Sequence, residues 1–294
     1  MNQKLQGLGV ALVTPFNEEL SVDESALTRV VNHVIDGGAD FLVVLGTTSE
    51  APTMSMEEKK LVLKTVVETN DGKLPIVLGL GGNNTQELLA DIESYDLKGV
   101  DAFLSVVPYY NKPTQEGLAA HFSALSKASP LPIILYNVPG RTVTNMLPHT
   151  TVNLGKEHKN IIGIKEASGN IAQGMKIVQN APADFLILSG DDDLVMPQVA
   201  AGFHGVISVV GNAYPKLFKD MITAIKAGDL EKGKAIHYQL LTLIDMLFEE
   251  GNPAGVKAVL TEMGIAQSFV RLPLLPASSG LKNRLKEEMA TISH

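Results

Sequence analysis

The segment Ile161-Ile162-Gly163-Ile164-Lys165 is a short apolar run that ends in a single charged residue. Seven further short apolar runs span residues 9–14, 41–46, 76–80, 102–107, 133–138, 185–190 and 205–210. Each run is mostly apolar instead of alternating, which is typical of strands covered on both faces, as in parallel sheets. The sequence therefore predicts eight buried parallel strands.

The segments between these runs carry apolar residues at helical spacing. Residues 23–35 place Leu27, Val30 and Val34 on one face, and residues 56–67 repeat the pattern. Strand and helix units that recur every ~20 to 35 residues favour a closed (β/α)8 TIM barrel. Periodicity alone also allows an open doubly wound sheet. Such a sheet more often has a glycine-rich phosphate loop after its first strand, where this chain has Thr14-Pro15-Phe16-Asn17.

The strand pattern stops at about residue 229. Residues 231–249, 253–263 and 281–292 all read as helices, and a proline-rich linker precedes the last of them. We therefore expect a catalytic barrel over residues 1–228 and a helical C-terminal extension over residues 229–294.

Composition limits the classes of function. The 294 residues are 45% hydrophobic, so the chain can bury a large core. A net charge of −8 argues against nucleic acid or an anionic membrane as the main partner, and the absence of cysteine excludes disulfides and thiolate catalysis. The amino terminus lacks a signal-peptide pattern and no apolar run is long enough to span a membrane, so a cytoplasmic location is expected. The histidines show no paired spacing, so no metal site is expected.

In a TIM barrel the active site lies at the carboxyl ends of the strands, so the residues that close each apolar run are the candidates. Lys165 is the main one, because burial penalises a charged amine and a neutral amine is the nucleophile that forms a Schiff base with a ketone. The alternative is that Lys165 forms an ion pair with Glu166 or an aspartate. Adjacent strand residues point to opposite faces, which makes a pair with Glu166 unfavourable.

Three hydroxyl side chains from other strand ends complete the candidate chemistry. The phenol of Tyr136 is suited to relaying protons to an imine, and Thr47 and Tyr110 are suited to extending that relay. The alternatives are that Thr47 and Thr48 cap the next helix and that Tyr110 only packs.

Two further polar segments follow strand ends. Arg141 lies on the loop after Tyr136, where its guanidinium is suited to binding a carboxylate through two hydrogen bonds, although a surface salt bridge is the alternative. Asp191-Asp192-Asp193 is expected to cap the helix that follows it and not to bind Mg²⁺.

Several motifs together resemble one known family over essentially the whole chain, the dihydrodipicolinate synthase family of pyruvate-dependent class I aldolases. The motifs are Gly46-Thr47-Thr48-Ser49-Glu50, Val107-Pro108-Tyr109-Tyr110-Asn111-Lys112-Pro113, Tyr136-Asn137-Val138-Pro139-Gly140-Arg141-Thr142, Gly163-Ile164-Lys165-Glu166-Ala167-Ser168-Gly169 and Ser189-Gly190-Asp191-Asp192. The resemblance implies 4-hydroxy-tetrahydrodipicolinate synthesis from pyruvate and L-aspartate 4-semialdehyde, in diaminopimelate and lysine biosynthesis. It implies no metal and no organic cofactor, because the reaction runs through a Schiff base on Lys165.

The resemblance also implies roles for the individual residues. Tyr136, Thr47 and Tyr110 match the family's proton relay, in which Tyr110 reaches into the site of a neighbouring subunit. Thr48 matches the residue that binds the pyruvate carboxylate, and Gly190 and the carbonyl of Ile207 match further positions of the site. Arg141 matches the residue that binds the semialdehyde carboxylate. A homotetramer built from tight dimers is implied. The alternative function is another pyruvate-lysine aldolase, such as an N-acetylneuraminate lyase or a 2-keto-3-deoxy-sugar-acid aldolase.

The sequence departs from the family pattern at two places. Ser49 replaces the usual glycine, which is expected to affect the turn that presents Thr47 and Thr48. Lysine-inhibited members have two histidines where this chain has Met56 and Lys59, and a cationic Lys59 would repel the ammonium of a bound lysine. The other effector contacts are matched by Asn83, Glu87 and Tyr109. We therefore predict weak or absent inhibition by lysine.

Overall fold

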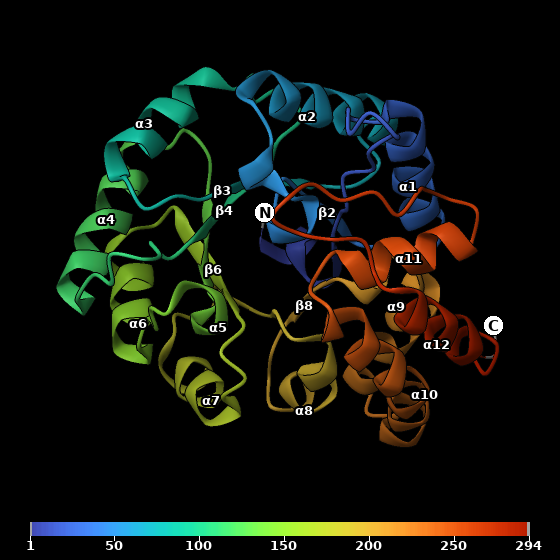
Figure 1. Cartoon of the computed structure of the whole chain (residues 1–294). Coiled ribbons are helices and arrows are strands. Elements are labelled where there is room, and N and C mark those ends of the chain that lie inside the picture. The colour runs from blue at the N-terminus through green and yellow to red at the C-terminus, as the bar shows by residue number, and fades with distance from the viewer. Residues whose placement is uncertain (1, 293–294) are drawn as a thin grey trace.

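The chain folds into a closed barrel of eight parallel strands, as the computed structural model shows for residues 2–292 (Figure 1). The strands are β1 (Gly7–Ala11), β2 (Phe41–Val44), β3 (Ile76–Leu80), β4 (Ala102–Val106), β5 (Ile133–Asn137), β6 (Ile161–Glu166), β7 (Leu186–Ser189) and β8 (Gly205–Ser208). The barrel closes where β1 pairs with β8 and Leu8 lies opposite Val206. The predicted (β/α)8 barrel is confirmed, and the open-sheet alternative is wrong.

Helices surround the barrel, and each strand leads into at least one of them (Figure 1). They are α1 (Glu24–Asp36), α2 (Met56–Asn70), α3 (Thr85–Ser94), α4 (Gln115–Ala128), α5 (Pro139–Thr142), α6 (Pro148–Glu157), α7 (Ile171–Asn180), α8 (Val195–Ala200) and α9 (Pro215–Lys226). Their starts follow the sequence. Ser55 and Glu58, for example, form a reciprocal capping box at the start of α2, which satisfies backbone donors there.

Three more helices follow α9, namely α10 (Leu230–Glu249), α11 (Ala254–Glu262) and α12 (Ser279–Met289). In Figure 1 they lie together beside α9, where α10 packs on α9 and α12 packs on both α10 and α11. The helical C-terminal extension is thus confirmed, whereas the division into domains after residue 228 stays a prediction. Over residues 2–292, no helix is both long and apolar enough to cross a bilayer.

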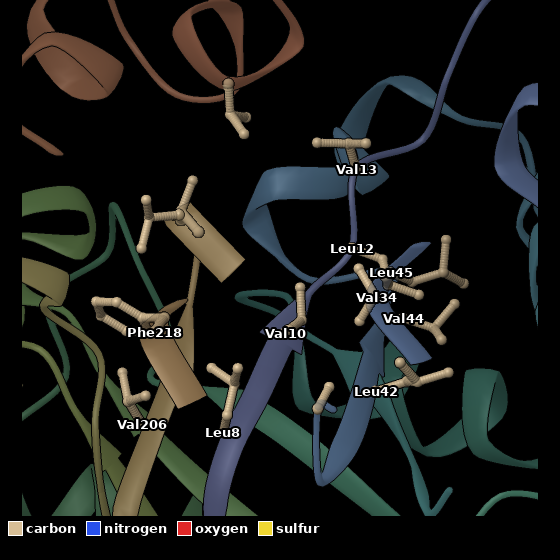
Figure 2. Packing of buried hydrophobic residues seen from close by; sticks show 14 of the residues in the cluster. Leu8, Val10, Leu12, Val13, Val34, Leu42, Val44, Leu45, Val206 and Phe218 are labelled. Atoms are coloured by element: carbon tan, nitrogen blue, oxygen red, sulfur yellow. The ribbon is translucent and has the colours of Figure 1, made fainter. Parts of the chain in front are cut away.

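Two layers of buried side chains alternate along the strands. Leu42 and Val44 of β2 face the helices, together with Leu8 and Val10 of β1, as Figure 2 shows. Phe41 belongs to the second layer, which fills the barrel interior and also contains Tyr136. Because strand side chains alternate between faces, this parity sends the side chain of Tyr136 inward at the carboxyl end of β5.

The first strand begins and ends earlier than predicted. Residues 9–14 were expected from the apolar run, but β1 stops at Ala11. Beyond it, the backbone N–H of Val13 donates to the side chain of Asn212 at 3.1 Å instead of to a neighbouring strand. The buried apolar run continues past the ladder because a side-chain amide satisfies the backbone there.

A buried histidine on α4 makes the stability depend on pH. Burial lowers the pKa of His121 from 6.5 to about 4. Between these values the unfolded chain binds a proton that the folded chain does not, so this contribution to stability is present above pH 6.5 and is lost as the pH falls towards 4. When the pH falls from 7 to 4.5, we expect the free energy of unfolding of His121→Asn to decrease by about 2 kcal/mol less than that of the wild type.

Urea unfolding at the two pH values measures this difference. His149→Asn is the matched control, because His149 is exposed on α6. If the free energy of unfolding decreased equally in the wild type and in His121→Asn, His121 would not be the source of the pH dependence.

Candidate active site

Lys165 and Tyr136 lie side by side on β6 and β5, because the register of these strands places them opposite each other. Both side chains are buried, with 6% and 7% of their surface exposed. Lys165 Nζ lies 4.4 Å from the centre of the Tyr136 ring. The phenol is therefore next to the amine, at the end of the barrel where catalytic groups of this fold gather.

The Lys165 amine has no ion-pair partner in the described part of the chain. Glu166 points to the other face of β6, where it accepts hydrogen bonds from Asn137 Nδ2 at 3.0 Å and from the backbone N–H of Ser168 at 2.9 Å. The alternative of a Lys165–Glu166 pair is therefore wrong. A buried amine without a carboxylate at hydrogen-bonding distance remains available as a nucleophile.

Gly190 leaves room for the lysine side chain. It follows β7, and a Cβ built at this position would lie 2.8 Å from Lys165 Cε and 2.5 Å from Ala167 Cβ. Any larger residue would therefore displace the amine. Ile207 lies on the neighbouring strand β8, in the apolar layer that fills the barrel interior.

Carboxylates after β7 lie close enough to influence the amine. Burial raises the pKa of Asp191 and of Asp192 to about 6 each, and the charge of Lys165 counters part of this rise. The expectation that these aspartates cap the following helix is wrong, since Asp191 makes no side-chain cap bond. Asp191 instead accepts from Gly169 N–H, and Asp192 accepts from the N–H groups of Val209 and Val210, which joins neighbouring strand ends.

Thr47 and Thr48 lie on a 3-10 turn (η2, Thr47–Ser49) that follows β2. The Ser49 hydroxyl donates to the carbonyl of Gly46 at 2.7 Å, a hydrogen bond within this turn that a glycine could not make. Thr48 is buried, and its hydroxyl accepts a hydrogen bond from Asn252 Nδ2 at 3.0 Å.

A buried ion pair anchors the same loop to the C-terminal extension. Lys257 Nζ of α11 lies 2.6 Å from Glu50 Oε1, and both side chains are essentially unexposed. Burial lowers the pKa of Lys257 to about 8, and the charge of Glu50 counters part of this effect. The backbone N–H of Arg271 donates to the second carboxylate oxygen of Glu50 at 2.8 Å.

The structure does not bring two predicted residues to this group. Arg141 is exposed on α5, directly after β5, and its guanidinium has no ion pair or hydrogen bond with residues 2–292. Tyr110 follows β4 and is 87% exposed, with a left-handed φ of 72°. An aromatic residue held in this conformation and facing solvent is suited to contact another molecule.

The residues matched to an effector site lie near the start of α3 and after β4. Asn83 and Glu87 are exposed, and Tyr109 is 37% exposed. Lys59 lies in the first turn of α2, where Met56 Sδ accepts a hydrogen bond from Ser94 Oγ.

Asn252 and Lys257 were not predicted as site residues from the sequence. Both lie in the extension, more than 200 residues from the threonine loop that they contact. The only sequence signal of such a contact was a lysine and an asparagine in an otherwise apolar stretch, at residues 252–260.

These features define a class of enzyme. A closed barrel presents a buried, unpaired lysine at the end of β6 beside a tyrosine, and no group of three or more acidic or histidine side chains in residues 2–292 is arranged to hold a metal. This is the arrangement of an aldolase that works through a lysine Schiff base.

Comparison with known proteins identifies the family. A sequence model of the dihydrodipicolinate synthetase family matches residues 4–292, and the chain belongs to this family. It is 52% identical to the 4-hydroxy-tetrahydrodipicolinate synthase of Flavobacterium psychrophilum, over 96% of this chain and 97% of that one. The crystal structure of dihydrodipicolinate synthase from Thermotoga maritima superposes with a TM-score of 0.94 at 40% identity, covering 97% of each chain. The lysine-bound enzyme from Cyanidioschyzon merolae gives a TM-score of 0.94 at 35% identity, covering 98% of each chain.

Proposed function

We infer that the protein is a 4-hydroxy-tetrahydrodipicolinate synthase, a lyase that condenses pyruvate with L-aspartate 4-semialdehyde through a lysine Schiff base. The observation that carries this inference is the buried Lys165 amine, unpaired among the described residues and held beside Tyr136 and Gly190 at the barrel mouth. The identity to synthases extends over nearly the whole chain, so it covers the site and the extension alike.

The chemistry follows from the amine. Lys165 Nζ adds to the keto carbon of pyruvate, and loss of water gives a protonated imine. The imine withdraws electrons, so a methyl proton leaves and an enamine forms. The enamine carbon attacks the aldehyde of the second substrate, whose oxygen takes up a proton. The amino group of that substrate then displaces Lys165 and closes the ring.

We assign the proton transfers to Tyr136, with Thr47 and Tyr110 as its relay partners. The Tyr136 ring lies beside the amine, so its phenol is suited to protonate the departing carbinolamine oxygen and to accept the proton afterwards. We assign Thr48 to binding the pyruvate carboxylate. Gly190 and the Ile207 carbonyl are assigned to lining the pyruvate site. No metal and no organic cofactor take part in these steps, because the protonated imine is the electron sink.

Arg141 is assigned to the carboxylate of the semialdehyde. Its guanidinium is exposed on a single helical turn after β5 and makes no bond with the described residues, so it is available to a ligand. A planar guanidinium binds a carboxylate through two parallel hydrogen bonds.

We propose a homo-oligomer, a tetramer built from tight dimers, in which Tyr110 of one subunit completes the relay of its neighbour. The exposure of 87% and the left-handed backbone of Tyr110 support this proposal. A cytoplasmic location stays a prediction.

Coupled turnover assays with different aldehydes test the function. We expect turnover of pyruvate with L-aspartate 4-semialdehyde, and much weaker turnover when an N-acetylneuraminate or 2-keto-3-deoxy-sugar-acid substrate is offered in the cleavage direction. Faster cleavage of a sugar acid than condensation with the semialdehyde would favour the alternative aldolase. Pyruvate binding without any turnover would identify a binding protein.

Lysine is expected to inhibit this enzyme weakly or not at all. Lys59 places a cation at the start of α2, at a position matched to an effector contact, and like charges repel. Titration with L-lysine to millimolar concentration during turnover measures the effect. Strong inhibition would contradict this reading, and Lys59→Ala, which removes the cation, is the matched comparison.

A further inference from the structure

The side chain of Asn252 connects the C-terminal extension to the barrel site. Asn252 lies between α10 and α11, and its Nδ2 group donates to Thr48 Oγ1 at 3.0 Å. Both side chains are at least 95% buried, with exposed fractions of 5% and 2%. This buried hydrogen bond joins residues 204 positions apart in the chain. It connects the loop after β2 with the C-terminal extension.

This hydrogen bond fixes the role of the Thr48 hydroxyl. A hydroxyl has one proton to donate and two lone pairs that accept. Because the Asn252 amide occupies a lone pair, the proton of Thr48 points elsewhere, and no residue from 2 to 292 accepts it. A carboxylate only accepts hydrogen bonds, so it is the ligand group that such a hydroxyl suits. The donated bond also polarises the hydroxyl and strengthens its own donation.

The opposite amide orientation would remove this property. With Asn252 Oδ1 facing Thr48, the hydroxyl would donate to the asparagine and would have no proton for a ligand. In the structure Oδ1 is buried without a partner among the described residues, while Nδ2 is the atom bonded to Thr48.

The surrounding anchors hold this geometry. Lys257 pairs with Glu50, two residues after Thr48, and Arg271 binds the same carboxylate through its backbone. The threonine loop and the extension are therefore fixed to each other independently of Asn252. We therefore expect the loop to keep its place when the Asn252 amide is removed.

We propose that Asn252 is a positioning residue that sets the Thr48 hydroxyl as a hydrogen-bond donor to the carboxylate of the keto acid. The proposal rests on the proposed function, and it places a determinant of pyruvate binding in the C-terminal extension. Asn252 acts through Thr48.

Two variants at this position test it. Asn252→Ala removes the donor, and Asn252→Asp replaces it with a carboxylate that accepts the hydrogen bond of the Thr48 hydroxyl. We expect the pyruvate KM to rise about 10-fold in Asn252→Asp and less in Asn252→Ala, while the semialdehyde KM stays within twofold of the wild type. Asn70→Asp is the matched control, because Asn70 is a buried asparagine that binds Leu74 just before β3, at the opposite end of the barrel. It should lower stability without changing the pyruvate KM.

A double-mutant cycle isolates the contact. In a Thr48→Val background the hydroxyl is gone, so Asn252→Asp should change the pyruvate KM less than twofold. The same 10-fold rise in that background would overturn the proposal, as would an unchanged pyruvate KM in the single variants.

Borohydride trapping with pyruvate gives a second readout. The pyruvate concentration for half-maximal trapping does not depend on how much protein is folded, so it remains measurable in variants that fold poorly. An untrapped wild type would overturn the proposed function itself. A trapped wild type with equal half-saturation in all variants would overturn only the role of Asn252.

Discussion

Lys165→Met should lower kcat by about 10³-fold or more, with the barrel still folded. Methionine keeps an unbranched side chain of similar length beside Tyr136 and Gly190, so packing is largely conserved, but it has no amine to form the imine. Without the imine the methyl group of pyruvate is not acidified and no enamine carbon is available to attack the aldehyde.

Lys176→Met is the control, because Lys176 is exposed on α7. It should retain wild-type turnover. The measurement is steady-state turnover at saturating concentrations of both substrates, with circular dichroism melts to confirm folding. Turnover of Lys165→Met within tenfold of the wild type would contradict a covalent mechanism.

Arg141→Ala should lower kcat/KM for L-aspartate 4-semialdehyde by about 10²-fold and leave pyruvate trapping unchanged. The reason is that the guanidinium contributes to the binding of the semialdehyde, through its carboxylate, and not to imine formation on Lys165. The exposed position of Arg141 on α5 predicts a small effect on stability.

The two readouts separate this role from a general disturbance. Arg284→Ala, which removes an exposed ion pair with Glu249 on the extension, serves as the control and should change neither quantity. Equal losses of pyruvate trapping and semialdehyde turnover in Arg141→Ala would place the arginine in the pyruvate site instead.

Features of the fold and site that depend on local sequence were predictable. Apolar runs predicted all eight strands, because a strand buried on both faces must be apolar along its length. Tyr136 and Lys165 were expected together because they end consecutive runs, and consecutive strands are neighbours in a barrel. Their register, with Tyr136 opposite Lys165, follows from hydrogen bonding that no local pattern encodes.

Features that depend on distant contacts were not predictable. The Asn252–Thr48 and Lys257–Glu50 contacts each join residues more than 200 positions apart. The aspartates after β7 looked like helix caps because this is their common local use, but they bind backbone groups of adjacent loops instead. Tyr110 faces solvent in the single chain, so the relay role proposed for it requires a second subunit.

Borohydride reduction in the presence of pyruvate shows whether Lys165 forms a covalent imine. We expect one pyruvate-derived adduct, located by mass spectrometry on the peptide that contains Lys165, and no adduct in Lys165→Met. An active enzyme whose Lys165 peptide stays unmodified, or an adduct on a different lysine, would contradict it.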